Sequence, residues 1–295
     1  MKKRFFLYFF KDFIINLNLK IFKILIIFVF LIFLSSCANK NIFSIHTIDV
    51  GQGDSILIHT DDNKNILIDC GDENAEHTVY SYLKRNGVNR IDMLFASHSD
   101  TDHIGSMDYI IDKIQVSKLY LTEGYKENDA FNNMIKSCKN NNVKIEFIKK
   151  GDSFRLNDYT TVNILSPSHT DENVNLNSSV LLINYKDKKL LFMGDAEEEN
   201  EREILSDPLL TDVDFLKAGH HGSSSSSIPE FIEKIKPEIV TISCGYRNDY
   251  GHPHKSVLDT FRKNNSSVFR TDINGSIAFY IDENGFYSRK KYISE

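Results

Sequence analysis

The stretch Ser-His-Ser-Asp-Thr-Asp-His-Ile-Gly-Ser at residues 97–106 decides the fold. It follows the apolar run Met-Leu-Phe-Ala, which predicts a buried strand, and it leads into a predicted helix. Four potential metal ligands stand within six residues: His98, Asp100, Asp102 and His103. Burying two close carboxylates is costly unless a cation compensates them, and this segment contains no Lys or Arg. The pattern therefore predicts a divalent metal site, and the alternative is a polar loop in which Asp102 caps the helix.

Three further segments place His or Asp just after an apolar strand. They are Gly194-Asp195 after 190–193, Gly219-His220-His221-Gly222 after 213–218, and Gly251-His252-Pro253-His254 after 240–245 and a short loop. Side chains at strand ends gather at one rim of a sheet, where loops can build a site. Each segment alone is ambiguous, because Asp after Gly is common in turns. Their combination in this order indicates a shared site.

Strands cluster early and late in the chain, with helices in both halves. We expect strands at 42–50, 55–59, 66–69, 93–96, 117–121, 143–148, 160–165, 179–185, 189–193, 213–217, 238–243, 267–270, 276–281 and 286–290. We expect helices at 75–86, 105–114, 127–139, 197–205, 228–235 and 255–263. This pattern favours a sheet-on-sheet core with helices outside over a doubly wound sheet. It predicts a single domain at 42–295.

These segments resemble the metallo-β-lactamase fold, and within it the branch of the extracytoplasmic nuclease domain of the competence protein ComEC. The similar blocks are IDVGQGDSILI (48–58), LIDCG (67–71), SHSDTDHIGS (97–106), LLFMGDAEEE (190–199), LKAGHHGSSSSS (216–227), YGHPHKSVLDTF (250–261) and FRTDINGSIAF (269–279). The resemblance implies an α+β fold, the αββα sandwich of two mixed β-sheets with helices on the outer faces. It also implies a site for two divalent metal ions at the rim between the sheets.

Carried over residue by residue, the resemblance assigns the metal ligands. His98 and Asp100 would hold one ion, Asp102, His103 and His221 would hold the other, and Asp195 would bridge both. The wider superfamily has His where Asp100 stands, so the first ion has fewer protein ligands here. Spacing alone does not choose between His220 and His221, and the resemblance favours His221 as ligand with His220 facing the substrate. A ligand set of nitrogen and oxygen admits Zn²⁺ or Mn²⁺.

Other residues are assigned supporting roles. Asp54 and Asp69 are expected to orient the imidazole ligands, the alternative being turn residues without a metal role. The block at 174–180 matches an Asn/Ser-rich block of the ComEC-like branch, so Asn175 and Asn177 are expected at the substrate. Lys217 would contact a phosphate oxygen or pair with a carboxylate. His169 is interpreted as a surface loop residue.

The N-terminal segment has the features of a targeting signal. A basic stretch is followed by the apolar run Ile24–Leu34, which is short for a membrane span and suits a signal peptide at 1–36. Leu34-Ser35-Ser36-Cys37 resembles a bacterial lipobox, which implies a lipid on Cys37, a tether at 37–41 and an extracytoplasmic lipoprotein held at the membrane. The alternative is an uncleaved anchor with an incidental Cys. Cys70, Cys138 and Cys244 are interpreted as small buried residues, with one disulfide left open.

The net charge of the chain limits the classes of substrate that it is expected to bind. The 295 residues are 41% hydrophobic and 26% charged, which excludes a disordered chain. Residues 1–36 carry six of the 35 basic residues and one of the 41 acidic ones, so the remainder has a formal charge of −11. Such a body lacks the broad basic surface of a general nucleic-acid binder. A nucleic-acid substrate held mainly by metal ions remains compatible with it.

Together these features predict a metal-dependent hydrolase, a binuclear phosphodiesterase or nuclease, with DNA among the candidate substrates. Asp102, His220 and His252 are the predicted catalytic residues, and His220 or His252 would supply a proton to the leaving alkoxide. One alternative is a cell-surface phosphodiesterase acting on teichoic-acid or phosphorylcholine-type diesters. The other is a non-catalytic lipoprotein that uses the fold for binding. The sequence points to no protein partner.

Overall fold

The computed structural model describes residues 42–295. The predicted signal peptide, the tether and Cys37 lie outside the described residues. Within residues 42–295, no helix is both long enough and apolar enough to cross a membrane.

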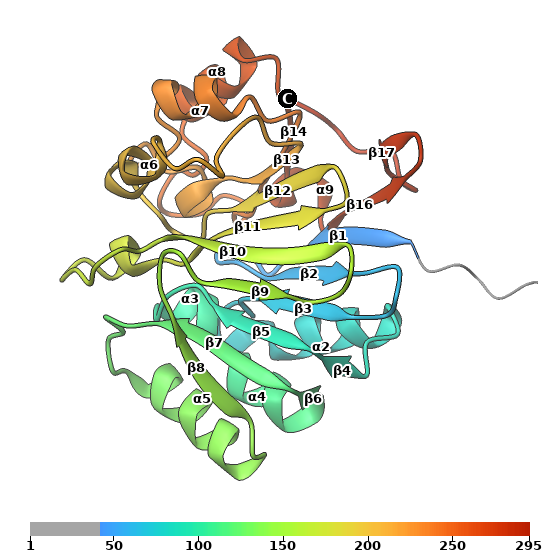
Figure 1. Cartoon of the computed structure of the whole chain (residues 1–295), viewed down its shortest axis with the longest axis vertical. Helices are drawn as coiled ribbons and strands as arrows, with labels where there is room; N and C mark the ends of the chain where they lie inside the picture. The colour runs from blue at the N-terminus through green and yellow to red at the C-terminus, as the bar shows by residue number, and fades with distance from the viewer. Residues whose placement is uncertain (1–41) are drawn as a thin grey trace, which may run out of the picture. The chain divides into compact units, whose positions relative to one another are not determined.

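Two mixed sheets carry most of the strands (Figure 1). The first has the order β17-β16-β1-β2-β3-β5-β7-β8, and its strands are β1 (Phe43–Thr47), β2 (Ile56–His59), β3 (Asn65–Ile68), β5 (Met93–Ala96), β7 (Lys118–Thr122), β8 (Lys144–Ile148), β16 (Ile277–Asp282) and β17 (Gly285–Tyr287). The second has the order β15-β14-β13-β12-β11-β10-β9, and its strands are β9 (Ser153–Arg155), β10 (Thr160–Ser166), β11 (Val180–Tyr185), β12 (Lys188–Phe192), β13 (Phe215–Lys217), β14 (Ile239–Ile242) and β15 (Ser267–Arg270). The neighbours from β3 to β8 and from β12 to β15 run parallel.

Helices cover the outer face of each sheet (Figure 1). The α-helices are α2 (Glu76–Arg85), α3 (Thr101–Ile104), α4 (Met107–Lys113), α5 (Asp129–Asn140), α6 (Glu198–Ile204), α7 (Pro229–Ile235), α8 (Lys255–Lys263) and α9 (Thr271–Asn274). Short 3-10 turns are η1 (Glu73–Ala75), η2 (Val174–Asn177) and η3 (Gly219–Gly222). α2, α4 and α5 pack on the first sheet, and α6, α7 and α8 pack on the second.

Strand alternation explains the four layers. In β12, Leu190 and Phe192 enter the core between the sheets, whereas Leu191 enters the core under α6 to α8. In β5, Phe95 faces the other sheet and Leu94 faces the helices. Because side chains alternate along a strand and both faces are buried, these strands read as continuous apolar runs. The predicted αββα sandwich is confirmed.

The differences from the expected elements are local. The helix expected at 105–114 is α4, which begins at Met107, and the short helix α3 before it was not expected; Gly105 and Ser106 form a turn between the two. A Cβ on Gly105 would lie 2.6 Å from the backbone nitrogen of Glu73, so this turn packs directly on η1. The short strands β4 (Arg90–Ile91), β6 (Gln115–Val116) and β9 were not expected. Two or three residues give too little periodicity to detect.

The three cysteines of the described domain are buried, as expected. Cys70, Cys138 and Cys244 are free thiols. Burial raises the pKa of Cys138 and of Cys244 to about 12, so both remain protonated at neutral pH. Among these three residues the disulfide that was left open is not formed.

Candidate metal centre

The predicted ligands meet at one rim of the sandwich. The loops that carry them follow β5 of the first sheet and β12 and β13 of the second. A hydrogen bond joins the two sheets at this rim, because the backbone nitrogen of Ser179 donates to the Ser97 carbonyl at 2.8 Å. The backbone nitrogen of Asp195 donates to the Ser178 hydroxyl at 3.1 Å. Both sheets therefore contribute side chains to one small volume.

His103 is held from behind by Asp69. The Nδ1 atom of His103 lies 2.8 Å from Asp69 Oδ2, and its Nε2 atom lies 3.2 Å from Asp195 Oδ1. Both His103 and Asp69 are fully buried. A carboxylate at Nδ1 fixes the proton there, so the lone pair of Nε2 faces Asp195. Asp69 thus lies where the sequence placed it, behind an imidazole.

The same carboxylate also orders His98 through Ser97. Asp69 accepts hydrogen bonds from the Ser97 backbone nitrogen at 2.8 Å and from the Ser97 hydroxyl at 2.6 Å. Because the Ser97 hydroxyl donates its proton to Asp69, its oxygen can only accept, and it accepts from His98 Nδ1 at 3.0 Å. The proton of His98 is therefore on Nδ1, and its Nε2 lone pair is free. Sequence reasoning did not identify Ser97, which looks like any small residue at a strand end.

His221 presents Nε2 from the opposite sheet. Its Nδ1 atom donates to the Ser243 carbonyl at 3.0 Å, and its Nε2 lies 3.3 Å from Asp195 Oδ2 and 3.4 Å from Asp102 Oδ2. Asp195 therefore turns one oxygen toward His103 and the other toward His221. The predicted bridging role of Asp195 is compatible with this placement and stays a prediction.

An unusual backbone turn separates the two adjacent histidines. His220 has a φ of 45° and His221 a φ of 54°, both in the left-handed region. Gly222 follows at +81°, and a Cβ there would lie 2.5 Å from Pro253 Cβ. Such turns are costly for side-chain-bearing residues and concentrate at functional sites. The turn buries His221 in the cluster and leaves His220 partly exposed at the rim, and the assignment of His221 as the ligand stays a prediction.

The cluster contains polar atoms that lack partners. In the part of the chain that the structure describes, the buried Nε2 atoms of His98, His103 and His221 and Oδ1 of Asp195 have no hydrogen-bond partner. His98, His103 and Asp195 offer ligand atoms within 4.8 Å of one another, and so do Asp102, His103 and His221. Buried polar atoms are normally satisfied. Three aligned lone pairs and a shared carboxylate fit a cation at this point.

The other two predicted acidic ligands, Asp100 and Asp102, are more exposed to solvent than Asp195. Asp102 Oδ2 lies 3.9 Å from His103 Nε2, and its side chain is 35% exposed. Asp100 Oδ2 lies 3.7 Å from His98 Nε2, and its side chain is 45% exposed. Asp100 belongs to none of the compact ligand groups among the described residues. The metal role of Asp100 therefore stays a prediction.

The electrostatics of the cluster favour separated charges. Burial alone would lower the pKa of His103 and His221, but the Asp195 carboxylate raises both well above their ordinary value. Burial would raise the pKa of Asp195, and the two imidazoles lower it well below its usual range. Protons therefore occupy the cluster unless another cation replaces them. Cation binding must release these protons.

Lys217 lies beneath the centre rather than at its opening. Its side chain is 0% exposed; its ammonium forms an ion pair with Asp54 and donates to the Gly194 carbonyl at 3.2 Å. Asp54 Oδ1 in turn lies 3.4 Å from His221 Nδ1. Of the two roles considered for Lys217, the structure shows the carboxylate pair. The predicted substrate contact of Lys217 is wrong, because a substrate cannot reach a fully enclosed ammonium.

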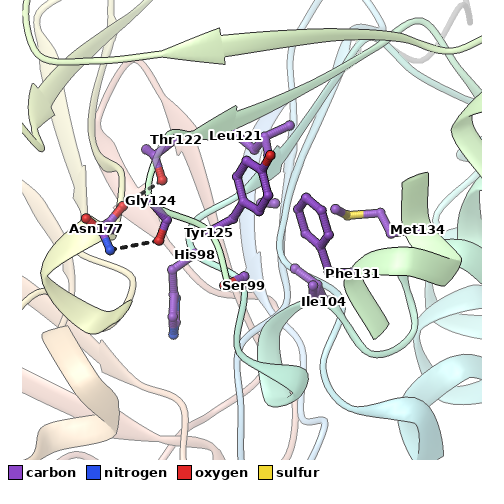
Figure 2. Close-up of a pocket in the computed structure, with 11 residues that line it drawn as sticks. His98, Ser99, Ile104, Leu121, Thr122, Gly124, Tyr125, Phe131, Met134 and Asn177 are labelled. Carbon is purple, nitrogen blue, oxygen red and sulfur yellow. Dashed lines mark hydrogen bonds between the residues drawn. The ribbon is translucent and has the colours of Figure 1, made fainter. Parts of the chain in front are cut away.

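The asparagines predicted at the substrate behave differently from each other. Asn177 is buried, and its amide donates to the Gly124 carbonyl at 2.9 Å (Figure 2). It also donates to the Asp171 carbonyl at 2.9 Å. Its oxygen accepts from the backbone nitrogen of Asp171 at 2.8 Å. Because these bonds occupy its amide, the predicted substrate contact of Asn177 is wrong, and the residue clamps two loops. Asn175 is half-buried and donates to Glu197 at 3.2 Å, and its substrate role stays a prediction.

His220 stands at the rim with a carboxylate partner. Its Nδ1 atom lies 3.2 Å from Glu197 Oε1 and 3.0 Å from the Ser225 hydroxyl, and its Nε2 lies 3.7 Å from Asp195 Oδ2. The hydrogen bond to His220 lowers the pKa of Glu197, which is therefore ionised. Sequence reasoning missed Glu197, since it is the first of three successive glutamates at the start of α6.

His252 lies behind the rim histidine. Its ring centroid is 5.7 Å from that of His220 and 6.4 Å from that of His221. Burial and the neighbouring histidines lower the pKa of His252 to about 4, so its imidazole is neutral at pH 7. A neutral imidazole suits hydrogen bonding better than proton donation. His254 accepts from the Ser224 backbone nitrogen, and His169 is exposed on a loop beside Ser168, as expected.

An apolar pocket adjoins His98 (Figure 2). It is lined by Ala96, His98, Ser99, Ile104, Leu121, Thr122, Gly124, Tyr125, Phe131, Met134 and Asn177. Tyr125 stacks on Phe131 with ring centroids 4.3 Å apart and closes one side. Between its side chains the pocket has room for little more than a single water molecule. As it stands, the pocket packs behind His98 and does not admit a substrate group.

Comparison with known proteins identifies a family whose members share this kind of site. Residues 48–246 match the family model described as the metallo-beta-lactamase superfamily. The chain belongs to the metallo-beta-lactamase superfamily. Proteins of this superfamily typically bind divalent metals as hydrolases, and the His and Asp clusters here are of the kind required.

Within the superfamily, the predicted likeness to competence proteins is confirmed. The chain is 30% identical over 268 residues to ComE operon protein 3 of Bacillus subtilis, a match covering 85% of this chain and 34% of that protein. It is 27% identical to Competence protein ComA of Neisseria gonorrhoeae, covering 93% of this chain and 38% of that protein. The chain thus spans about a third of the length of these curated relatives.

The solved structures show the shared fold. The crystal structure of CmlA, a diiron beta-hydroxylase from Streptomyces venezuelae, superposes with a TM-score of 0.56 at 14% identity. That match covers 81% of this chain and 54% of CmlA. At so low an identity, the similarity concerns the architecture of the metallo-beta-lactamase domain alone.

Proposed function

We propose that this metallo-beta-lactamase domain is an extracytoplasmic, metal-dependent phosphodiesterase that acts on nucleic acid. The observation that carries the proposal is the convergence of three imidazole Nε2 atoms on the two oxygens of Asp195. The donor atoms are all nitrogen or oxygen, and three of the proposed ligands, Asp100, Asp102 and Asp195, are carboxylates. Such a set suits hard divalent ions and leaves the centre able to attract an anionic diester.

The chain would hold two Zn²⁺ or Mn²⁺ ions. His98 and Asp100 would hold one, Asp102, His103 and His221 would hold the other, and Asp195 would lie between them. Divalent ions in such a centre supply Lewis acidity for water attack on phosphorus and for the charge that develops there. The chain's own contribution is the fixed direction of each Nε2 lone pair, set by Asp69, Ser97 and the Ser243 carbonyl.

His220 is the best-placed residue to protonate the leaving alkoxide. Its Nδ1 is held by Glu197, and its Nε2 points to the rim of the centre, 3.7 Å from Asp195 Oδ2. A carboxylate behind the imidazole keeps the ring oriented while Nε2 transfers a proton. The His252 ring packs against the His220 ring. Because its imidazole is neutral at pH 7, we assign it a hydrogen-bonding role.

The preference for nucleic acid is supported by the relatives. One of them is named a competence protein, and another bears the name ComE operon protein 3. The chain matches only about a third of these proteins, so their whole activity does not transfer to it. The competing substrate is a teichoic-acid or phosphorylcholine-type diester, and the competing role is binding without hydrolysis.

The test uses the full chain purified in mild detergent. We expect up to two Zn or Mn per chain by mass spectrometry, and hydrolysis of bis(p-nitrophenyl) phosphate with either ion. Asp195→Ala should abolish the hydrolysis while the circular dichroism spectrum is unchanged, and Asp187→Ala, whose side chain is 81% exposed, serves as the control. Retained activity in Asp195→Ala would exclude the bridging role.

A substrate panel separates the alternatives. Single-stranded DNA, double-stranded DNA, RNA, poly(glycerol phosphate) and a β-lactam are each incubated with Mn²⁺ and with Zn²⁺. We expect cleavage of nucleic acid and none of the lactam. Cleavage of poly(glycerol phosphate) alone would favour the cell-surface diesterase, and a folded, metal-loaded protein without any cleavage would favour binding.

The proposed location depends on Cys37. Globomycin or Cys37→Ser should block N-terminal processing, seen as a larger precursor on a gel and loss of the lipid mass. Cys70→Ser controls for the loss of a thiol. Unchanged processing would refute lipidation without touching the proposed activity.

A further inference from the structure

A loop beside the centre exposes two tyrosines. We call residues 245–252, between β14 and α8, the tyrosine loop. Tyr246 is 71% exposed and Tyr250 is 66% exposed, the two most exposed large apolar or aromatic side chains of the described domain. Aromatic rings are usually packed in a core or an interface, because their burial is strongly favourable. Two open rings next to a candidate catalytic centre therefore call for a ligand.

The tyrosine loop is held in shape by its own hydrogen bonds. The Asn248 amide donates to the carbonyls of Gly245 at 2.9 Å and His252 at 2.6 Å, and its oxygen accepts from the His252 backbone nitrogen at 2.9 Å. The Gly245 nitrogen donates to Gln52 Oε1 at 3.1 Å. These bonds tie both ends of the loop together. The two rings are thus presented by an ordered support, which reduces the entropy lost when a ligand binds.

The loop is linked to the centre by a series of ring contacts. Tyr250 stacks on His252 with centroids 5.5 Å apart at 22°, and His252 lies against His220 and His221. At the outer end, the Arg247 guanidinium lies 5.2 Å from the Tyr246 ring centroid. Arg247 and Asp249 are both exposed there, so the loop itself has no net charge. Its recognition chemistry is accordingly planar stacking rather than general attraction of anions.

We infer that the tyrosine loop stacks the unpaired bases next to the phosphodiester that is cleaved. This inference rests on the proposed phosphodiesterase function and specifies its substrate as single-stranded nucleic acid. Every base has a planar face, so stacking on tyrosine works without sequence preference. Bases within a duplex are already stacked on each other. A polyol phosphate has no planar group to place on these rings, which disfavours a teichoic-acid-type ligand.

The first test compares substrates with and without bases. For a single-stranded thymidine oligomer, Tyr250→Ala and Tyr246→Ala should each raise KM about 10-fold, within the range of base stacking on aromatic side chains. For an abasic deoxyribose phosphate oligomer of the same length and for poly(glycerol phosphate), which have no planar group, the rise in KM should be several-fold smaller. Tyr159→Ala is the matched control, because Tyr159 is 60% exposed with Lys186 5.7 Å from its ring centroid, at the far end of the sandwich. Equal rises in KM for the thymidine oligomer and for the abasic oligomer would overturn the inference.

The second test measures binding of a thymidine oligomer in the absence of hydrolysis. The chain contains no Trp, so Tyr250→Trp introduces a single fluorophore. A thymidine oligomer added to the EDTA-treated protein at low salt should quench this fluorescence, with no quenching in Tyr159→Trp. A missing quench, or an equal quench in both variants, contradicts base stacking at the loop. If wild type hydrolyses no diester but Tyr250→Trp is still quenched selectively, the proposed hydrolysis fails while the binding platform stands.

Discussion

At the scale of single residues, Asp69 acts on two ligands at once. It accepts from His103 directly and orders His98 through the Ser97 hydroxyl. Imidazole ligands commonly rely on a hydrogen-bonded partner at the other ring nitrogen to fix the tautomer. Here one buried carboxylate and one hydroxyl determine the direction of two lone pairs. Removing the hydroxyl separates these two effects.

We therefore expect Ser97→Ala to weaken metal affinity by about 10–100-fold, the range found when partners behind metal ligands are removed. The physical reason is that His98 Nδ1 loses its acceptor while His103 keeps Asp69. Isothermal titration with Zn²⁺ measures the effect. Ser179→Ala is the control, because Ser179 is buried nearby and its hydroxyl has no partner among the described residues. An unchanged affinity in Ser97→Ala would mean that the ring does not depend on this bond.

The buried pair of Lys217 and Asp54 gives a second residue-scale prediction. Lys217→Met leaves the Asp54 carboxylate buried without its cation, which should lower the free energy of unfolding by about 3–5 kcal/mol. Adding Asp54→Asn should recover part of that loss, since the uncompensated charge is removed. Urea unfolding of the two single variants and the double variant measures the coupling. Lys188→Met, at the half-exposed pair with Asp214, should cost far less. Additive losses would contradict the coupling.

At the scale of elements, α6 supports the segment that follows the adjacent histidines His220 and His221. Glu201 of α6 is buried and accepts from the backbone nitrogens of Ser227 at 2.5 Å and Ile228 at 2.8 Å. Those nitrogens lie where the serine run 223–227 enters α7. Backbone nitrogens at the entry to a helix lack partners within it, so the Glu201 carboxyl group satisfies these two. The run after His221 is thereby fixed at its far end.

Burial raises the pKa of Glu201 to about 8 from an ordinary value of 4.5. The folded protein then keeps a proton that the unfolded protein releases, so this group makes folding less favourable as pH rises from 4.5 to 8. Glu201→Gln keeps an acceptor but does not titrate. We expect the wild type to lose stability relative to Glu201→Gln across that pH range, in urea unfolding at matched metal content. A difference that is constant with pH would contradict the assignment.

Sequence periodicity recovered most elements because the long strands and helices have strong patterns. The helix α8 and the strand β15 begin and end where they were expected. The start of α4 at Met107 rather than Gly105 was not predictable, because it depends on Gly105 packing against η1, which is distant in sequence. At the site, the ligand residues stood out by type and order. The partners of Lys217 and Asn177 did not, because tertiary contacts alone decide whether such side chains face a substrate or a neighbouring loop.

At the scale of the molecule, the centre joins the two sheets. His98 and His103 follow β5 of the first sheet, whereas Asp195 and His221 follow β12 and β13 of the second. A cation bound by all four would add a link across the sandwich that the unfolded chain cannot form. Binding to the folded state alone stabilises it in proportion to the logarithm of ligand excess.

Metal removal should therefore lower thermal stability. At 100-fold excess over the dissociation constant, a single ion contributes about 2.7 kcal/mol, or about 5–10 °C in a domain of this size. Scanning fluorimetry with Zn²⁺, with Mn²⁺ and with EDTA measures the shift. The melting temperature of Asp195→Ala should be nearly insensitive to these additions. An identical melting temperature of the wild type with and without EDTA would rule out a structural contribution from the ion.

The distribution of ligands along the chain has a practical consequence for protein engineering. The exposed loop at 168–173 lies between the histidines of the 98–103 segment and the pair Asp195 and His221. A chain cut there yields two fragments, neither of which can complete the cluster. Reassembly of such fragments would depend on dissolved zinc or manganese, so the cut protein would serve as a two-piece reporter of these ions.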